Sequence, residues 1–269
     1  MAELERLFEE IARKHGDLTA KQVRYAIREI GRIRGDIADL LADFESGDGT
    51  IKRQRLMRLL RELEQIEKSM QIYGMDALIR VIEESADFTI TEENSALVAL
   101  IGLPLIKRNK RASVRGEVTK LVIKRKGDDG LALDDRIWNM SGIIRDSIAT
   151  QIRSDVIKGV SVGTMVRNVR KIYDGETWMI KRLVVTESNT AYRTATAKSI
   201  ERSEVADWLR IVDNGFRHPH HKEHRCYELA QEDRYNMGRG IFRPTDTEIY
   251  SPHPQCSSFL IPVLKSEYL

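Results

Sequence analysis

The sequence contains few cysteines, few aromatic residues and no long apolar segment. Only two of its 269 residues are cysteine, which is too few for a disulfide scaffold and favours a reducing compartment. No run of about 18 apolar residues occurs, so we expect neither a membrane span nor a membrane partner. The first ten residues are acidic and amphipathic, unlike a secretory signal or a transit peptide. With 6% aromatic and 32% charged residues, the composition is typical of a charge-rich helical protein.

Motifs of several common enzyme classes are also absent. The segment Gly238-Arg239-Gly240 lacks the trailing glycine and the strand–helix context of a phosphate-binding loop. The sequence contains no Gly-x-Ser-x-Gly elbow and no His-Glu-x-x-His pair. We therefore predict that the protein is not an enzyme.

The net charge of +3 is distributed unevenly along the chain. Residues 1–100 carry 15 Lys and Arg against 20 Asp and Glu, whereas residues 107–126 carry nine against one. Such a run favours contact with a polyanion, and we predict that it binds DNA phosphates. The alternative is a solvated hairpin. The nine basic residues are Lys107, Arg108, Lys110, Arg111, Arg115, Lys120, Lys124, Arg125 and Lys126.

Apolar periodicity predicts a mainly α-helical fold with a small α+β unit at the C-terminus. Residues 1–106 read as a helical bundle, with one apolar stripe from Val23 to Phe44 and a second from Leu56 to Met70 that Gly74 ends. Residues 107–130 are predicted to be a basic linker with a strand at 118–123 and a hairpin turn at 127–130.

Residues 131–269 form the third predicted domain. Three helices are expected up to Ser199, separated at Lys158-Gly159 and at Asp174-Gly175. The period then shortens, which predicts strands at 205–212 and 247–250 and a short helix at 226–233. These elements would form the small α+β unit.

The C-terminal segment holds both cysteines and five of the six histidines. His224 precedes Cys226 by two residues, and His253 precedes Cys256 by three. Thiolate and imidazole are ligands that zinc prefers, so the two pairs predict a shared zinc site. If the first segment turns, His220 or His221 replaces His224. The alternative is a metal-free loop with two reduced, half-buried cysteines.

A polar string lies in the middle of the last predicted helix, from Thr186 to Arg193. It is either an exposed face or a buried hydrogen-bonded network that includes Arg182, Thr186, Glu187 and Arg193. A buried Glu187 would need a cation such as Arg182 or Arg193. His15, the sixth histidine, is expected to be solvated.

The order of several motifs resembles the phage Mu F-like minor head proteins, the phage head morphogenesis family. The resemblance covers about residues 128–263. It is based on Gly130-Leu131-Ala132-Leu133-Asp134-Asp135-Arg136-Ile137-Trp138, Lys158-Gly159-Val160-Ser161, Arg182-Leu183-Val184-Val185-Thr186-Glu187, Trp208 with Asp213, Cys226-Tyr227-Glu228-Leu229 and His253-Pro254-Gln255-Cys256.

The resemblance implies a helical Mu F-like domain over residues 131–269. The Thr-Glu motif of the family falls on Thr186 and Glu187, and its cysteine-rich motif falls on Cys226, His253 and Cys256. The family often has a further cysteine near the place of Glu223 and His224, and it often ends in Cys-Arg-Cys where this chain has Cys256-Ser257-Ser258.

The resemblance further implies a minor capsid protein of a tailed phage or prophage, in the head interior or portal region after assembly in the host cytoplasm. Its expected partners are the portal protein, a major capsid or scaffolding protein, and phage DNA. One alternative is a metal-dependent nuclease or another DNA-processing enzyme, using His218 and His220 or using His221, Asn236 and His253. A third interpretation is an interaction module without metal or DNA.

Overall fold

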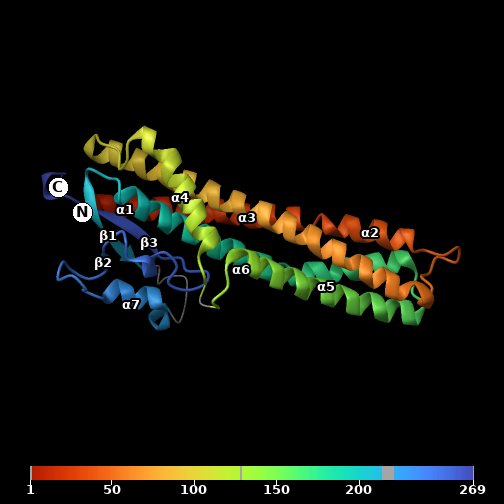
Figure 1. Ribbon diagram of the computed structural model, residues 1–269. Coiled ribbons are helices and arrows are strands. Elements are labelled where there is room, and N and C mark those ends of the chain that lie inside the picture. The colour runs from red at the N-terminus through yellow and green to blue at the C-terminus, as the bar shows by residue number, and fades with distance from the viewer. Residues whose placement is uncertain (1, 128, 214–220, 269) are drawn as a thin grey trace. The chain divides into compact units, whose positions relative to one another are not determined.

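The computed structural model describes residues 2–127, 129–213 and 221–268, with the side chain of His221 left out. Long helices dominate it, and a small antiparallel sheet lies in the C-terminal part of the chain, which confirms the predicted fold class (Figure 1). The helices are α1 (Ala2–Ile30), α2 (Ile33–Asp43), α3 (Leu56–Ile101), α4 (Arg111–Lys124), α5 (Leu133–Lys158), α6 (Val162–Ile200) and α7 (Arg225–Gln231). The strands are β1 (Ala206–Val212), β2 (Ile241–Phe242) and β3 (Phe259–Leu264).

The chain forms two compact units, each made of separate segments. Unit 1 comprises residues 1–22, 79–130 and 182–269, and unit 2 comprises residues 23–78 and 131–181. Helices α1, α3 and α6 each contribute one part to each unit. The sequence-based division at residues 106 and 130 follows the chain in order, whereas the units combine segments from both of its halves.

Unit 2 is a helical assembly held by the predicted apolar stripes. Ile37 and Leu41 of α2, Leu59 and Leu63 of α3, and Ile144 of α5 are all buried. Residues at i, i+3 and i+4 share one helix face, so the residues of each stripe are buried together. The stripes identified in the sequence are therefore the core of this unit.

Helix α3 is continuous through Gly74, so the break predicted there is wrong. A Cβ atom at Gly74 would lie 3.1 Å from the Ile137 side chain of α5. The glycine thus allows a close approach of two helices, and the loss of helix propensity, about 1 kcal/mol, is too small to end a long amphipathic helix.

Helix α6 is likewise continuous through Asp174-Gly175, and the turn predicted there is also wrong. The helix end at Lys158-Gly159 is confirmed: Gly159 has φ 67° and closes α5 in the left-handed conformation. Both sites contain glycine. Only Gly159 adopts a backbone conformation that requires it.

Residues 111–124 form helix α4, so the predicted strand at 118–123 is wrong, whereas a hydrogen bond from the Gly130 N–H to the Gly127 carbonyl at 2.9 Å confirms the turn predicted at 127–130. The buried residues are Val114, Val118 and Val122, which recur every four positions. β-branched residues favour strands only weakly, and a helical burial pattern overrides that preference. The basic run is therefore mostly helical.

The sheet of unit 1 has the order β2-β1-β3, with both pairs antiparallel. Strand β1 confirms the strand predicted at 205–212, and α7 confirms the short helix, whereas residues 247–249 form a 3-10 turn in place of the predicted strand. The hydrophobic core of this unit joins the sheet to helices, and it includes Phe8 and both cysteines, Cys226 and Cys256.

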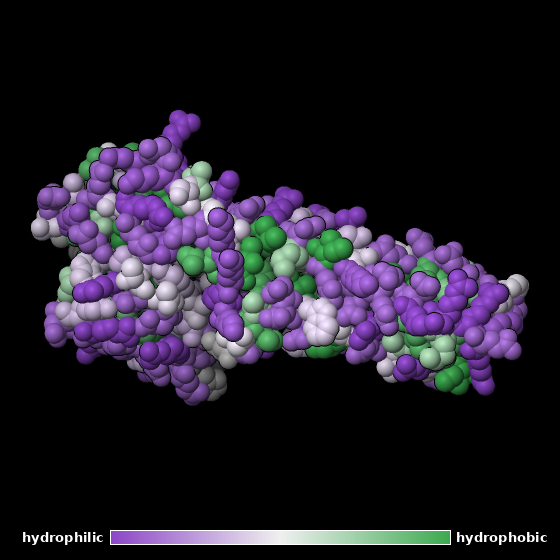
Figure 2. Space-filling view, in the orientation of Figure 1, coloured by the Kyte–Doolittle hydropathy of each residue, from purple (hydrophilic) through white to green (hydrophobic). Residues whose placement is uncertain are grey.

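Figure 2 shows a surface that is mostly hydrophilic, with hydrophobic patches along the helices. None of the helices in the described residues is both long enough and apolar enough to cross a bilayer.

Candidate metal centre

Three of the four predicted ligands form one cluster in unit 1. One ligand atom from each of His224, Cys226 and His253 lies within 4.8 Å of the other two, so the cluster can hold a metal ion. Within the described ranges, these residues are the group of three or more such donors that meets this distance. Cys226 Sγ lies 3.1 Å from His253 Nε2, and the two imidazole rings are 4.6 Å apart between centroids.

Local structure explains how these side chains meet. His224 is the extended residue that precedes α7, and Cys226 lies in the first turn of that helix with 6% of its surface exposed. His253 comes from the Ser251-Pro252-His253-Pro254 turn, where two prolines restrict the backbone. A strand was expected to bring His224 and Cys226 to one face, but a helix start does so instead.

The hydrogen bond of His253 sets its tautomer. His253 Nδ1 lies 2.9 Å from the carbonyl oxygen of Pro254, which can only accept, so Nδ1 carries the proton. The lone pair of Nε2 then faces Cys226 when the ring is neutral. A histidine held in this way by its other nitrogen is typical of a metal ligand.

Cys256 is the neighbour of this cluster rather than a member of it. Cys256 is 1% exposed, and its Sγ lies 3.0 Å from Ser258 Oγ. The hydrogen bond with Cys226, Arg193 and His253 together lower the pKa of Cys256 to about 3 against the opposing effect of burial. The same hydrogen bond, together with burial, raises the pKa of Cys226.

The charge of Cys256 in turn affects His253. Burial alone would lower the pKa of His253, but the hydrogen bond and the charge of Cys256 raise it above its usual value. A metal ion takes the place of such protons, because thiolate and neutral imidazole are the forms that bind. Three of the four donors predicted from the sequence thus lie close enough to share a metal ion, and Cys256 lies next to them.

Two residues of α6 anchor the loop that presents His253 and Cys256. Arg193, 1% exposed, donates to the carbonyl oxygens of Tyr250, Cys256 and Ser258 at 2.8, 2.9 and 2.9 Å. Thr186 Oγ1 accepts from the backbone N–H of Gln255 at 3.1 Å. Gln255 has φ 56°, a strained value for a non-glycine residue, so the two anchors stabilise an unfavourable turn.

The other histidines considered as ligands cannot be placed. His218 and His220 lie outside the described residues, and so does the side chain of His221. Asn236, considered for a nuclease, has φ 55° and belongs to an exposed turn before Gly238, and it is not part of the metal cluster.

The predicted polar network is buried, but its cation is a different one. Glu187 is fully buried, and both of its carboxylate oxygens accept from Arg125 at 3.0 and 2.9 Å. Arg182 is exposed and Arg193 binds the carbonyl oxygens, so neither is the partner expected for Glu187. The sequence does not indicate Arg125 as the partner of Glu187, because 62 residues separate the two.

His15 is buried, so its predicted exposure is wrong. Its Nε2 lies 3.3 Å from Ser188 Oγ, and its ring stacks on Tyr192 at 4.5 Å between centroids. Thr19, Gln22 and Ser85 complete a network of buried hydroxyl and amide groups around Ser188. Burial, together with the charge of Arg193, lowers the pKa of His15 to about 3, so the ring stays neutral.

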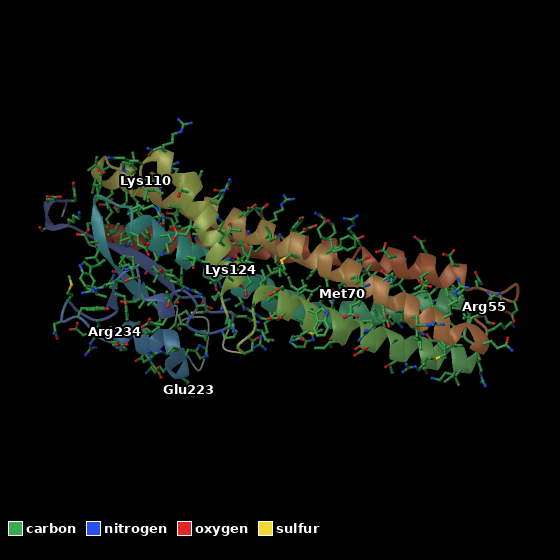
Figure 3. All side chains as sticks on the ribbon, in the orientation of Figure 1. Arg55, Met70, Lys110, Lys124, Glu223 and Arg234 are labelled. Atoms are coloured by element: carbon green, nitrogen blue, oxygen red, sulfur yellow. The ribbon has the colours of Figure 1, made fainter. Side chains whose placement is uncertain are left out.

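Three of the nine basic residues predicted to bind DNA are already paired within unit 1. Lys107 contacts Glu204 at 2.6 Å, Arg115 contacts Asp87 at 2.9 Å, and Arg125 contacts Glu187. Lys110, which precedes α4, and Lys124, the last residue of α4, are labelled in Figure 3. Lys110, Arg111 and Arg125 are half-buried, whereas Lys107, Arg108, Arg115, Lys120, Lys124 and Lys126 are exposed.

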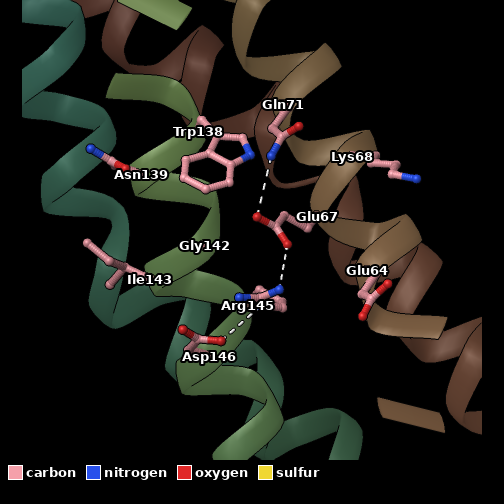
Figure 4. Close-up of a pocket in the computed structure, with 10 residues that line it drawn as sticks. All are labelled: Glu64, Glu67, Lys68, Gln71, Trp138, Asn139, Gly142, Ile143, Arg145 and Asp146. Carbon is pink, nitrogen blue, oxygen red and sulfur yellow. Dashed lines mark hydrogen bonds and ion pairs between the residues drawn. The ribbon is translucent and has the colours of Figure 1, made fainter. Parts of the chain in front are cut away.

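Unit 2 has a groove of its own between α3 and α5 (Figure 4). Arg145 contacts Glu67 at 2.8 Å and Asp146 at 2.9 Å along it, and Trp138 is 60% exposed beside them. None of the residues predicted as functional lines this groove. Arg145 pairs with two of the three carboxylates of the groove, and Glu64 and Lys68 complete its charged lining.

Comparison of the chain with family models, curated proteins and solved structures finds no match. The resemblance to phage head proteins thus stays a prediction from the residues that suggested it.

Proposed function

We propose that the protein is a non-enzymatic minor capsid protein of a tailed phage or prophage, and that a zinc ion bound by His224, Cys226, His253 and Cys256 stabilises its C-terminal part. The observation that supports the zinc assignment is the cluster of His224, Cys226 and His253, whose ligand atoms lie within 4.8 Å of one another although the residues are distant in sequence. Four protein ligands fill a tetrahedral zinc shell and leave no position for substrate, which is typical of structural sites.

The assembly role is supported by the order of the motifs between Gly130 and Cys256 and by the segregated basic run. The helical segments would dock on the portal or the capsid, and the exposed part of the run would contact packaged DNA. Thr186 fits this proposal in a structural sense, since it holds the loop of the zinc ligands.

Zinc content tests the first half of the proposal. Purified protein is expected to contain one zinc per chain, and Cys226→Ala and Cys256→Ala should each reduce this amount and the thermal stability. Removing the metal with a chelator should destabilise wild type but leave the double variant unchanged. Retention of full zinc content by both variants would exclude this set of ligands.

Presence in particles tests the second half. Mass spectrometry of purified phage particles from the encoding genome should find the protein in a few copies per portal. Particles that lack it would contradict the capsid role without affecting the zinc assignment.

A hydrolytic metal site is the second candidate. It is favoured by the fact that three donors, not four, lie mutually within 4.8 Å, because three protein ligands would leave one position for water. Incubation with supercoiled DNA and magnesium, manganese or zinc tests it. Nicking that His253→Ala abolishes would favour a nuclease over a structural clip.

A further inference from the structure

A pocket of unit 1 lies where the basic run ends. It has a volume of about 410 Å³ and is bounded by the end of α4, by one face of α6 and by the turn around Thr247. Its polar and charged lining consists of Lys124, Arg125, Lys126, Thr190, Thr194, Thr247, Glu248 and Ser251. Two ammonium groups without an ion pair among the described residues, and several hydroxyl groups, thus surround one space.

The charges of the pocket favour an anion. Arg125 is held by Glu187, and Glu248 is held by Arg234, so these two pairs largely cancel. Neither Lys124 nor Lys126 forms an ion pair with any residue that the structure describes, and both are exposed. The pocket therefore keeps a positive charge from two lysines. Lysine near the C-terminal end of a helix is also stabilised by the helix dipole, which accounts for the position of Lys124 without a ligand.

The side chain of Thr194 also points to a bound ligand. Its side chain is 1% exposed and lines the pocket, and its hydroxyl forms no hydrogen bond with the described residues, although the hydroxyl oxygen is not among the polar atoms that the protein encloses completely. Buried hydroxyl groups are normally paired, and the threonine one helix turn earlier follows this rule, since Thr190 donates to the Thr186 carbonyl at 2.8 Å. A ligand with acceptor oxygens could accept the hydrogen bond that the Thr194 hydroxyl is able to donate.

We propose that this pocket binds a phosphate group, with the ammonium groups of Lys124 and Lys126 and the hydroxyl of Thr194 as donors. Phosphate offers several acceptor oxygens and negative charge, and the volume leaves room for an attached sugar. The inference rests on the proposed function in one respect: the DNA backbone is the expected source of the phosphate. A free phosphorylated molecule shares the same chemistry.

The test compares a pocket variant with a control of equal charge. The pocket variant combines Lys124→Gln, Lys126→Gln and Thr194→Val, of which the last keeps the side-chain shape. The control combines Lys171→Gln and Lys181→Gln, two exposed lysines of unit 2. Binding of a short random-sequence duplex is followed by fluorescence anisotropy over a salt series, and binding of inorganic pyrophosphate by calorimetry.

We expect the pocket variant to lose about tenfold or more in duplex affinity and to reduce the salt slope by about two, while the control stays near wild type. Pyrophosphate binding should weaken in the same variant. Wild type that binds pyrophosphate but no duplex would support the pocket and contradict the DNA contact of the proposed function.

The outcome that overturns the pocket is equally specific. Full affinity of the pocket variant for both ligands would exclude it. A further variant would combine Lys107→Gln, Arg108→Gln and Lys120→Gln. If this variant then bound the duplex more weakly, DNA would contact another part of the basic run. Single Thr194→Val and single Lys126→Gln variants keep the test valid if the combined variant unfolds.

Discussion

Arg193 places a guanidinium in the core of unit 1, where it is completely enclosed by protein. Burial is the main cause that lowers its pKa, with the charges of the two cysteine thiols acting against it. A buried cation is tolerated only when its donors are paired, and here three carbonyl oxygens serve that purpose. The residue thus fixes the backbone that presents Cys256.

Replacing Arg193 by Met should destabilise the fold by about 3–5 kcal/mol, because three buried carbonyl groups lose their partner. Metal affinity should fall with it, as judged by competition with a chelator. Arg193→Lys should be intermediate, since one ammonium cannot reach all three oxygens. Arg182→Met, on an exposed face of the same helix, is the control and should change urea unfolding by less than about 0.5 kcal/mol. Equal loss in both variants would contradict the anchoring role.

Glu93 is a buried carboxyl group that shares its surroundings with Thr196 and Tyr192. Burial raises the pKa of Glu93 from 4.5 to about 8, and the hydrogen bond from Thr196 only partly offsets this. Between these two values the folded chain holds a proton that the unfolded chain releases. The free energy of unfolding contributed by this group therefore falls as pH rises from 4.5 to about 8 and is then level.

Glu93→Gln removes this titration. The free energy of unfolding, measured with urea, should fall with pH in wild type but not in the variant. The difference between variant and wild type should therefore rise by a few kcal/mol from about pH 5 to about pH 9. His15 titrates in both proteins, so its contribution cancels in the difference. Glu83→Gln, which removes an exposed carboxyl of the same helix, is the control variant. A flat difference for Glu93→Gln would mean that the carboxyl is not buried as described.

At the scale of elements, the long helices explain which glycines matter. Gly175 lies exposed in the interior of α6, and a Cβ atom there would meet nothing within 4 Å. Gly159 ends α5 with φ 67°. Helix interior and helix end therefore impose opposite demands on the same residue type.

Gly175→Ala should stabilise the protein by about 0.5–1 kcal/mol, because alanine loses less backbone entropy in a helix. Gly159→Ala should destabilise by about 1 kcal/mol, because its φ is strained for alanine. Urea midpoints of the two variants provide the measurement. Destabilisation by Gly175→Ala would instead support the Asp-Gly turn expected from the sequence.

At the scale of the whole molecule, each unit takes its core from segments far apart in the sequence. The hydrophobic core of unit 1 includes Leu4, Phe8 and Ile11 of α1 and Leu97 of α3, together with Ile261 of the sheet. A chain cut between sequence domains would remove part of this core. Contacts of such high sequence separation also make folding slow.

A fragment of residues 131–269, the predicted Mu F-like domain, should therefore fail to fold alone. It lacks the α1 and α3 side chains and also Arg125, the partner of the buried Glu187. We expect no cooperative urea transition by circular dichroism and poor amide dispersion by NMR. The full chain is the control. A cooperatively folded fragment would show that the C-terminal sequence domain is independent.

Several features could be predicted from the sequence because they depend on local pattern. The apolar stripes of α2, α3 and α5, the end of α5 at Gly159, strand β1 and helix α7 all follow from residue period and from glycine chemistry. The meeting of His224, Cys226 and His253 followed from ligand chemistry, since two separated His–Cys pairs suit one metal ion.

Tertiary packing alone decided the rest. The close approach of Ile137 explains Gly74, and burial of Val114, Val118 and Val122 makes the basic run a helix. The partner of Glu187 and the lining of the phosphate pocket join residues about 60 to 130 positions apart, which no local period encodes. A sequence specifies which side chains need partners, whereas the folded chain determines which partners they meet.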